Sequence, residues 1–260
     1  MREGIASQFL ARIVNWSAHA TRRRRLLTSG VCIVGVFLLF SQVGQGAVLE
    51  TFQADFARES SSGVKGEILR GRVSFEASAG RLLVEVSGPV HQWMVLQGKE
   101  TLLYYPEQQQ AFRMISKTDT SMPFFKVIWS CFKEDFDLAR QGFKMARYEK
   151  KGTTLLSIWT PPANLSKLVG EATLEYDGNK LMRVEHKTAH GNMLSRAVFR
   201  QHTVFGGYAF PLEVAISYGS KQGVTDERVV YSNPRFNTPL PAVVRDFKIP
   251  AGIKVQDIEW

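Results

Sequence analysis

The segment Trp93–Ile115 constrains the fold most strongly, because it predicts three short strands that are apolar on both faces. Aromatic, β-branched and aliphatic residues fill these strands, and a glycine and a proline mark the tight turns between them. In the first strand, Trp93 and Val95 alternate with Met94 and Leu96. A sheet that is apolar on both faces must be covered on both, or must line a cavity with one of them.

Residues 1–46 predict an export signal. They hold six arginines and one acid, a net charge of +5, which leaves +4 of the total +9 for the remaining chain. Arg22–Arg25 precede the 18 uncharged residues Leu26–Val43, and Gly44–Ala47 are small or polar, as at a signal-peptidase site. The same 18 residues approach the length of a membrane span, so a retained inner-membrane anchor is the alternative. In both cases we expect residues 47–260 in the periplasm.

Residues 47–260 predict one mainly β domain of α+β type, because turn signals separate short apolar strands and no linker stands out. About eleven strands and two or three helices are expected, in a strongly curved antiparallel sheet that is open or half-closed. The predicted strand pairs cover residues 66–87, 143–160, 171–188 and 193–218, with an edge strand over 225–231. The proline-containing stretch after residue 231 is expected to be irregular.

Two segments predict helices. Val48–Phe56 carries apolar residues at i, i+3 and i+4 spacing, which is typical of a short amphipathic helix. Thr118–Phe132 predicts a helix with one very apolar stripe, formed at i, i+3, i+4 and i+7 by Phe125, Ile128, Trp129 and Phe132. This second helix is either packed permanently on the sheet or plugs a lipid cavity and can move. The following Lys133–Gln141 is polar, and we expect it to be exposed.

The sequence contains none of the common catalytic or metal-binding patterns. It has no Gly-rich phosphate loop after a strand, no HExxH, no CxxC and no GxSxG. Cys131, the one cysteine left after signal cleavage, lies in an apolar stretch and predicts a buried, inert thiol. Glu134, Asp135 and Asp137 predict a solvated acidic cluster, and a hydrolase with an acid pair around Glu134 is the alternative. We therefore expect no enzyme, cofactor, metal site or nucleic-acid partner.

Several motifs resemble the LolA/LolB-like superfamily of periplasmic lipoprotein carriers. The resemblance is strongest over residues 48–115 and 243–255. The motifs, in chain order, are Phe52-x-Ala54-x-Phe56, Gly88-Pro89, Gly98-Lys99-x-Thr101-Leu102-x-x-Tyr105-Pro106 and Phe247-x-Ile249-Pro250-x-Gly252-x-x-Val255.

The resemblance implies an incomplete antiparallel β-barrel with helices as a lid over a hydrophobic cavity. It also implies a monomeric carrier that takes the acyl chains of lipoproteins from an inner-membrane release complex to an outer-membrane acceptor. The alternative is a module of the same fold, held at the inner membrane, that binds another lipid or senses mislocalised lipoproteins. Carriers of the LolA type hold the lid with an Arg-Pro pair, but here the corresponding stretch is Glu76–Gly80. Arg72 and Arg81 are the nearby arginines that could substitute.

The expected cavity lining combines the central strands with the second predicted helix. Its residues are Trp93, Val95, Leu102, Tyr104, Phe112, Met114, Phe125, Ile128, Trp129 and Phe132. A shift of one residue in facing parity would exchange the strand residues for their neighbours, because side chains alternate between the two faces of a strand.

Overall fold

The structure, a computed structural model, describes residues 48–61, 68–115, 127, 130, 131, 133, 135–206, 208–220 and 223–259. The predicted signal or anchor over residues 1–46 lies outside this part of the chain. Residues Ala47–Trp260 form one compact unit. In the described ranges, no helix has the length and apolar character needed to cross a bilayer.

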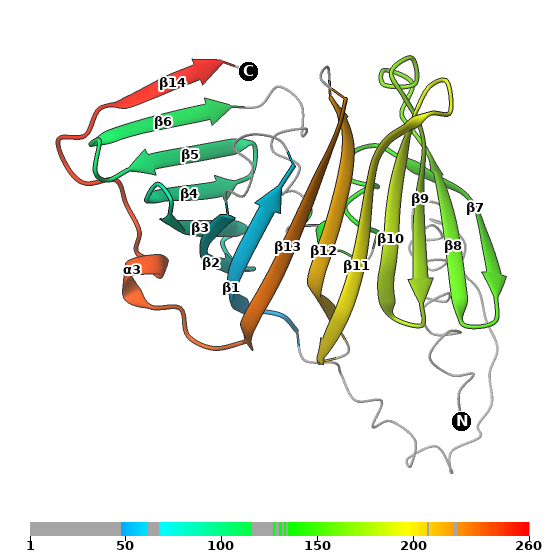
Figure 1. Cartoon of the computed structure of the whole chain (residues 1–260), viewed down its shortest axis with the longest axis horizontal. Helices are drawn as coiled ribbons and strands as arrows, with labels where there is room; N and C mark the ends of the chain where they lie inside the picture. Colours follow the sequence, from blue (N-terminus) through cyan, green and yellow to red (C-terminus); the bar gives the residue numbers. More distant parts are fainter. Residues whose placement is uncertain are drawn as a thin grey trace, which may run out of the picture. The chain divides into compact units, whose positions relative to one another are not determined.

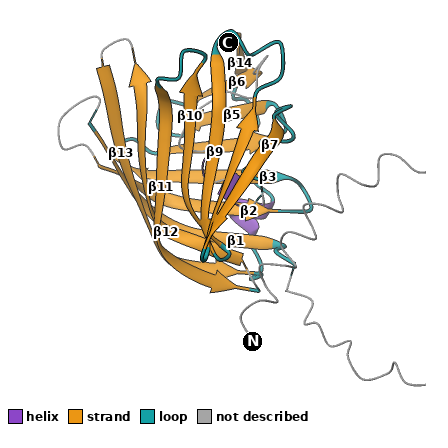
Figure 2. Ribbon diagram, turned by 90° about the vertical axis from the view of Figure 1, so that its right-hand side faces the viewer, coloured by secondary structure: helices purple, strands orange, loops and turns teal. Residues whose placement is uncertain are grey.

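The described residues form one curved, open sheet of fourteen strands (Figures 1 and 2). The strands are β1 Thr51–Ser60, β2 Ile68–Glu76, β3 Arg81–Gly88, β4 Gln92–Gln97, β5 Glu100–Tyr105, β6 Gln110–Ile115, β7 Lys144–Lys151, β8 Thr154–Thr160, β9 Val169–Asp177, β10 Lys180–Thr188, β11 Met193–Phe205, β12 Tyr208–Ser220, β13 Gly223–Phe236 and β14 Val255–Glu259. The predicted mainly β class and curved antiparallel sheet are confirmed, with more strands than expected.

Strand β1 joins the two halves of the sheet. It pairs antiparallel with β2 on one side and with β13 on the other, so the order is β14-β6-β5-β4-β3-β2-β1-β13-β12-β11-β10-β9-β8-β7. Neighbouring strands are antiparallel throughout, except that β14 runs parallel to β6. The free edges are therefore β14 and β7, and the sheet does not close into a barrel.

The predicted helix over Val48–Phe56 is wrong, because this stretch enters the sheet as β1. Phe52 and Phe56 are four residues apart, a spacing that suits both one helix face and one strand face. Ala54 lies between them on the same face of the strand and is buried as they are. Backbone pairing with two neighbouring strands decided the conformation, since hydrogen bonds on both sides fix a central strand.

The predicted irregular C-terminal tail is wrong in part. β13 continues through Pro234 to Phe236, and a short helix, α3 (Ala242–Arg245), follows. The chain then returns to the far edge of the sheet, where β14 pairs with β6 (Figure 1). Residues 240–255, named here the C-terminal segment, therefore connect the middle of the sheet to its edge.

The two faces of the sheet carry different side chains. The inner face carries one continuous apolar cluster that extends from β6 to β8. On the outer face of β3–β6, a second apolar cluster is covered by the C-terminal segment. Ion pairs occupy the outer face of the other half, for example Glu213 with Arg200 and Arg228. The central strands β4–β6 are thus apolar and buried on both faces, as the alternation of Trp93 and Val95 with Met94 and Leu96 predicts.

Candidate functional site

The inner face is the largest apolar surface that the sheet offers. Cross-strand pairs place its residues on one side, because residues directly opposite in an antiparallel pair share a face. They include Phe52 and Phe56 of β1, Val73 and Phe75 of β2, Val84 and Val86 of β3, Met94 of β4, Leu103 of β5, Met114 of β6, Leu174 of β9, Val184 of β10, Ala197 and Phe199 of β11, Val214 and Ile216 of β12, and Val229 and Tyr231 of β13.

A segment between β6 and β7 covers part of this face. Its described residues within 127–143 are named here the covering segment. Val127, Ser130 and Cys131 are helical, and Val127 and Ser130 are buried. Phe136 lies edge-on against Phe199, with ring centroids 5.9 Å apart. The segment is thus joined to the same apolar cluster as the sheet.

The expectation that Lys133–Gln141 is exposed is wrong at its centre. Phe136, Asp137 and Leu138 are buried, and Phe143 closes the segment against the inner face. The alternation of Phe136 and Leu138 with polar neighbours was the available signal, because it puts two apolar side chains on one side of the chain. The charged residues around these two side chains give the stretch as a whole a polar composition.

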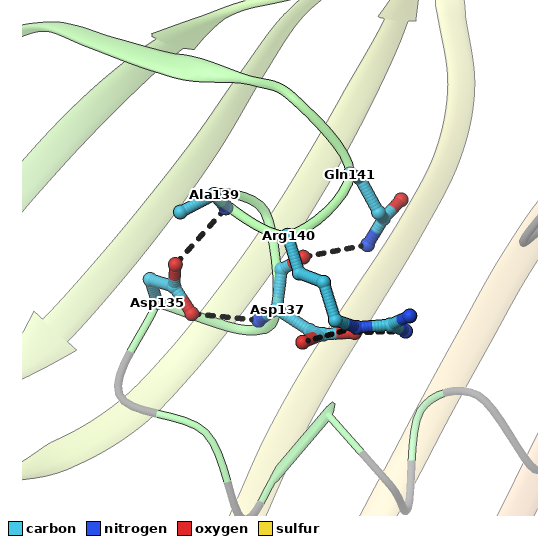
Figure 3. Close-up of polar contacts among 5 residues, drawn as sticks. All are labelled: Asp135, Asp137, Ala139, Arg140 and Gln141. Atoms are coloured by element: carbon cyan, nitrogen blue, oxygen red, sulfur yellow. Dashed lines mark hydrogen bonds and ion pairs between the residues drawn. The ribbon is translucent and has the colours of Figure 1, made fainter. Parts of the chain in front are cut away.

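A network of hydrogen bonds fixes the turn that carries Phe136 (Figure 3). The Asp135 carboxylate accepts hydrogen bonds from the backbone N–H of Asp137 at 2.9 Å and of Ala139 at 3.0 Å. Arg140 Nε donates to both carboxylate oxygens of Asp137, at 3.0 and 2.8 Å. Phe136 and Asp137 have positive φ angles of 53° and 64°. Such conformations cost free energy, so the network and the burial must hold them in place.

Burial also sets the chemistry of the thiol beside this turn. Burial raises the pKa of Cys131, and burial together with Cys131 raises the pKa of Tyr231. Both groups are therefore neutral at physiological pH, which suits an apolar interior.

The inner face also holds a buried ion pair that sequence reasoning missed. The side chain of Glu227 is 2% exposed and pairs with Arg58. Arg58 Nε donates to Glu227 Oε2 at 3.0 Å, and the Tyr218 hydroxyl donates to Oε1 at 2.9 Å. No pattern in the sequence links residues 58 and 227. They meet only because β1 pairs with β13.

On the outer face, the C-terminal segment is held by an aromatic stack and an arginine. The rings of Trp93 and Phe247 are stacked with centroids 4.9 Å apart. Arg81 donates to the carbonyl oxygens of Arg245 at 2.8 Å and Phe247 at 3.3 Å. Arg72 instead donates to Asp55 at 3.0 Å. Of the two arginines considered for a latch, Arg81 therefore holds a segment, but on the outer face rather than over the inner one.

The predicted lining residues fall on both faces of the sheet. The strand pairing places Trp93, Val95, Leu102 and Tyr104 on the outer face, toward the C-terminal segment or solvent. Phe112 and Met114 lie on the inner face, with Leu103 and Met94 as neighbours. In β4 and β5, the residues that face inward are therefore the neighbours of the predicted ones. In β6, the predicted residues themselves face inward. Phe125, Ile128, Trp129 and Phe132 lie outside the described residues.

A cleft of about 600 Å³ lies at the end of β1, next to β12 and β13. Ser61, Ser217 and Asp226 line it together with the apolar Ile68, Ala215 and Ile216. The three polar residues already bond to one another: the Ser217 hydroxyl donates to Asp226 at 2.6 Å, and the Asp226 N–H donates to the Ser61 hydroxyl at 2.8 Å.

The acidic residues 135 and 137 are engaged within the covering segment, and Glu134 lies outside the described part of the chain. Across the described ranges, no group of three or more His, Cys, Asp or Glu side chains is placed to hold a metal ion. The Asp135 carboxylate accepts hydrogen bonds from the backbone, and the Asp137 carboxylate accepts them from Arg140, so both are engaged within the turn.

The chain matches no protein-family model and no curated protein. Its fold, however, is similar to solved structures. A structure described as an outer membrane lipoprotein-sorting protein domain from Vibrio parahaemolyticus aligns with a TM-score of 0.55 and 16% identity, over 74% of this chain and 87% of that one. A LolA superfamily protein from Nitrosomonas europaea aligns with a TM-score of 0.53 and 13% identity, over 77% and 92%. A DUF1329 family protein from Desulfovibrio piger aligns at 0.56 and 10%, over 76% and 90%.

At these identities the alignments establish the fold. They agree with the motifs over residues 48–115 and 243–255, which suggested the same superfamily without any structure. This chain therefore has the same fold as the LolA superfamily protein and the lipoprotein-sorting domain.

Proposed function

We propose that this protein is a periplasmic carrier that binds the acyl chains of lipoproteins on its inner face and takes them from the inner to the outer membrane. The observation that supports the proposal most strongly is the continuous apolar inner face with a separate segment packed over it. An acyl chain needs a dry surface of this kind and few polar partners.

In this proposal acyl chains bind where the covering segment packs, so binding requires its displacement. Exposing its four main apolar anchors, Val127, Phe136, Leu138 and Phe143, would cost roughly 6–12 kcal/mol at 1.5–3 kcal/mol each. Burying an acyl chain of about fourteen methylenes returns roughly 11 kcal/mol at 0.8 kcal/mol per methylene. The two terms are comparable, so cargo and covering segment can exchange without nucleotide hydrolysis.

The proposal involves no catalysis. The sequence lacks the common catalytic patterns, and the two acids at positions 135 and 137 stabilise the turn of the covering segment. The expected partners are acylated lipoproteins, a release complex at the inner membrane and an acceptor at the outer membrane. These partners are inferred from the fold resemblance. The chain itself needs only to bind the acyl chains and to release them.

A second candidate uses the same face. In it the protein stays at the inner membrane and binds lipid or senses mislocalised lipoproteins. The uncharged segment Leu26–Val43 favours this alternative, because its length suits a retained anchor. The two candidates differ in whether the protein leaves the membrane, and fractionation of cells into soluble periplasm and membrane separates them.

Photo-crosslinking from two neighbouring strands tests the inner face directly. Phe112 of β6 and Leu102 of β5 are both half-buried, but they lie on opposite faces of the sheet. A photoreactive amino acid at position 112 should capture acylated lipoproteins in cells, and the same group at position 102 should not. Equal capture at both positions, or capture of unacylated proteins only, would exclude the inner face as the acyl site.

A further inference from the structure

The inner face is apolar along most of β1 and β13, but near one end of these strands it carries three polar side chains. They are Arg58, Tyr218 and Glu227, named here the polar end. Glu227 precedes Val229 by two residues on the same face of β13, and Val229 belongs to the apolar cluster. Ile216, also in the cluster, pairs with Glu227 from β12. The polar end is therefore continuous with the apolar surface, where β1 ends (the upper end of β1 in Figure 1).

Hydrogen bonds fix the guanidinium of the polar end. Arg58 Nε donates to Glu227 Oε2 at 3.0 Å, and Arg58 Nη2 donates to Oε1, which also accepts from the Tyr218 hydroxyl at 2.9 Å. Nε and Nη2 lie along one edge of the planar guanidinium, so Nη1 points away from Glu227. The side chain of Glu227 is 2% exposed and that of Arg58 is 22% exposed. A ligand therefore reaches the pair from the arginine side.

The net charge of the polar end is zero, and this limits the ligands that suit it. Elsewhere on the inner face, the described strands place one lysine, Lys150 on the exposed edge strand β7, and one histidine, His186. A carboxylate or phosphate at the polar end would stay an uncompensated charge beside an apolar surface, which is costly. An ester carbonyl needs only a hydrogen-bond donor and brings no charge.

The opposite end of the same face is closed by aromatic rings. Phe52 is fully buried, and its ring centroid lies 4.4 Å from that of Phe210 and 5.2 Å from that of Phe236. Phe52 and Arg58 lie on the same face of β1, roughly 20 Å apart at 3.3 Å per residue. This distance is comparable with the length of an extended acyl chain. The inner face thus has a polar, accessible end and an aromatic, closed end.

We propose that the polar end is a head-group subsite for uncharged acyl esters, in which Arg58 donates to an ester carbonyl and the acyl chain runs toward Phe52. This inference rests on the proposed function, because it takes the inner face as the acyl site. The diacylglyceryl group of a lipoprotein carries such esters, and its peptide would leave on the exposed side of Arg58. Glu227 lowers the affinity for fatty-acid and phospholipid anions, because it cancels the charge of Arg58.

A purely structural ion pair would behave differently. Its substitution would change the stability of the protein but not its choice between an ester and an acid. Glu227→Gln separates the two roles, because the amide keeps the shape and an acceptor oxygen but removes the balancing charge. Arg58 then becomes an uncompensated cation at the end of the inner face, and it should attract a carboxylate.

The test uses two photoreactive ligands with the same chain, dodecanoate and its methyl ester, each with a diazirine at the far end of the chain. The full chain is held in phosphatidylcholine nanodiscs in mildly alkaline buffer, so that dodecanoate is ionised. Mass spectrometry measures labelling against ligand concentration, and the ratio of the half-saturating concentrations, acid over ester, defines the selectivity. Uptake of ligand by the lipid cancels when variants are compared.

Glu227→Gln should lower this ratio about tenfold, as expected for one hydrogen bond to a charged group. The double variant Arg58→Gln/Glu227→Gln has neither charge and should restore the ratio of the wild type. Glu213→Gln is the matched control, because Glu213 is a buried carboxylate that pairs with two arginines on the outer face. It should leave the ratio unchanged. Circular dichroism shows that each variant is folded before its labelling is compared.

The wild-type protein gives a second readout, which decides the question if Glu227→Gln does not fold. A methyl ester with its diazirine next to the carbonyl should label residues 58–60 and 225–227. The ester with its diazirine at the far end of the chain should instead label the residues around Phe52 and Phe236. The two patterns map the direction of the bound chain without any substitution.

An unchanged ratio in Glu227→Gln, or the same change in Glu213→Gln, would overturn the head-group subsite. Labels from both esters at the same end of the inner face would also overturn it. In each of these cases the ligands still label the inner face, so the proposed acyl site stands. If neither ligand labels the inner face, the proposed function itself is contradicted.

Discussion

Phe136 packs edge-on against Phe199, with ring centroids 5.9 Å apart and planes at 69°, and this contact joins the covering segment to the inner face of β11. Phe199 is fully buried, and Phe136 is held by a turn in which Asp135 and Asp137 make their hydrogen bonds locally. The covering segment therefore has a rigid base at residues 135–141 and an apolar contact that cargo would replace in the proposed mechanism.

Shortening Phe136 tests this contact. We expect Phe136→Ala to lower the free energy of unfolding by about 3 kcal/mol, the lower end for a buried phenylalanine, because the segment can relax over the gap. Uptake of a fluorescent fatty-acid probe should increase, since less apolar contact has to be displaced. Tyr148→Ala, on the exposed strand β7, is the control and should change neither quantity. Lower stability without greater uptake would mean that Phe136 belongs to a permanent core.

Removing the Arg81 side chain should release the C-terminal segment from the outer face. Arg81→Ala loses two hydrogen bonds from a charged donor, and we expect a loss of about 1.5–3 kcal/mol in local or global stability. Hydrogen exchange of the amides over residues 244–249 should accelerate. Arg72→Ala is the matched control, because Arg72 bonds to Asp55 within the sheet. The same exchange pattern in both variants would contradict the role assigned to Arg81.

The buried ion pair on the inner face should be costly to break from one side. Glu227→Ala leaves the half-buried Arg58 without its carboxylate, and we expect a loss of about 3–5 kcal/mol. Tyr218→Phe removes a single hydrogen bond to the same carboxylate and should cost about 1 kcal/mol. Chemical denaturation measures both. Nearly equal effects would show that the hydroxyl, not the guanidinium, is the main partner of Glu227.

Low pH should lower the stability of the fold through Glu213, which lies on the outer face of the sheet. Hydrogen bonds from Arg228 and Arg200 hold the pKa of this carboxyl below its ordinary value of 4.5, although burial acts in the opposite direction. A lowered pKa in the folded state stabilises the protein fully above 4.5, and this contribution is lost as the pH falls through the folded-state pKa. The stability difference between wild type and Glu213→Gln should therefore shrink below pH 4.5 in urea titrations. A difference that stays constant down to pH 3 would contradict this assignment.

Local patterns predicted much of the sheet but not the pairing of strands that lie far apart in the sequence. The hairpins over residues 143–160 and 171–188 and the turn after Leu96 were predicted from their sequences. The glycines at these turns, Gly152, Gly178 and Gly98, all have positive φ angles. The pairing of β14 with β6 was not foreseen, since its partners are more than a hundred residues apart and Val255–Glu259 shows little apolar alternation. The helix prediction over residues 48–56 was wrong for another reason: a four-residue spacing of apolar residues fits both a helix and a strand.

The candidate site could be predicted in kind but not in detail. The two apolar faces of the central strands were evident from the alternation of Trp93 and Val95 with Met94 and Leu96. Which face meets the covering segment depends on the C-terminal segment, whose Phe247 covers Trp93 on the outer side. Phe136 and the Arg58–Glu227 pair were missed because their roles depend on contacts between distant strands.

Native mass spectrometry with a defined ligand tests the central claim, that the inner face receives acyl chains, most directly. The protein is mixed with a diacylglyceryl-modified lipopeptide and, separately, with the same peptide lacking the acyl chains. We predict a one-to-one complex with the acylated peptide only, and its loss when the covering segment is cross-linked to the sheet through cysteines at Phe136 and Phe199. Equal binding of both peptides, or binding of the acylated peptide that the cross-link does not change, would contradict the claim.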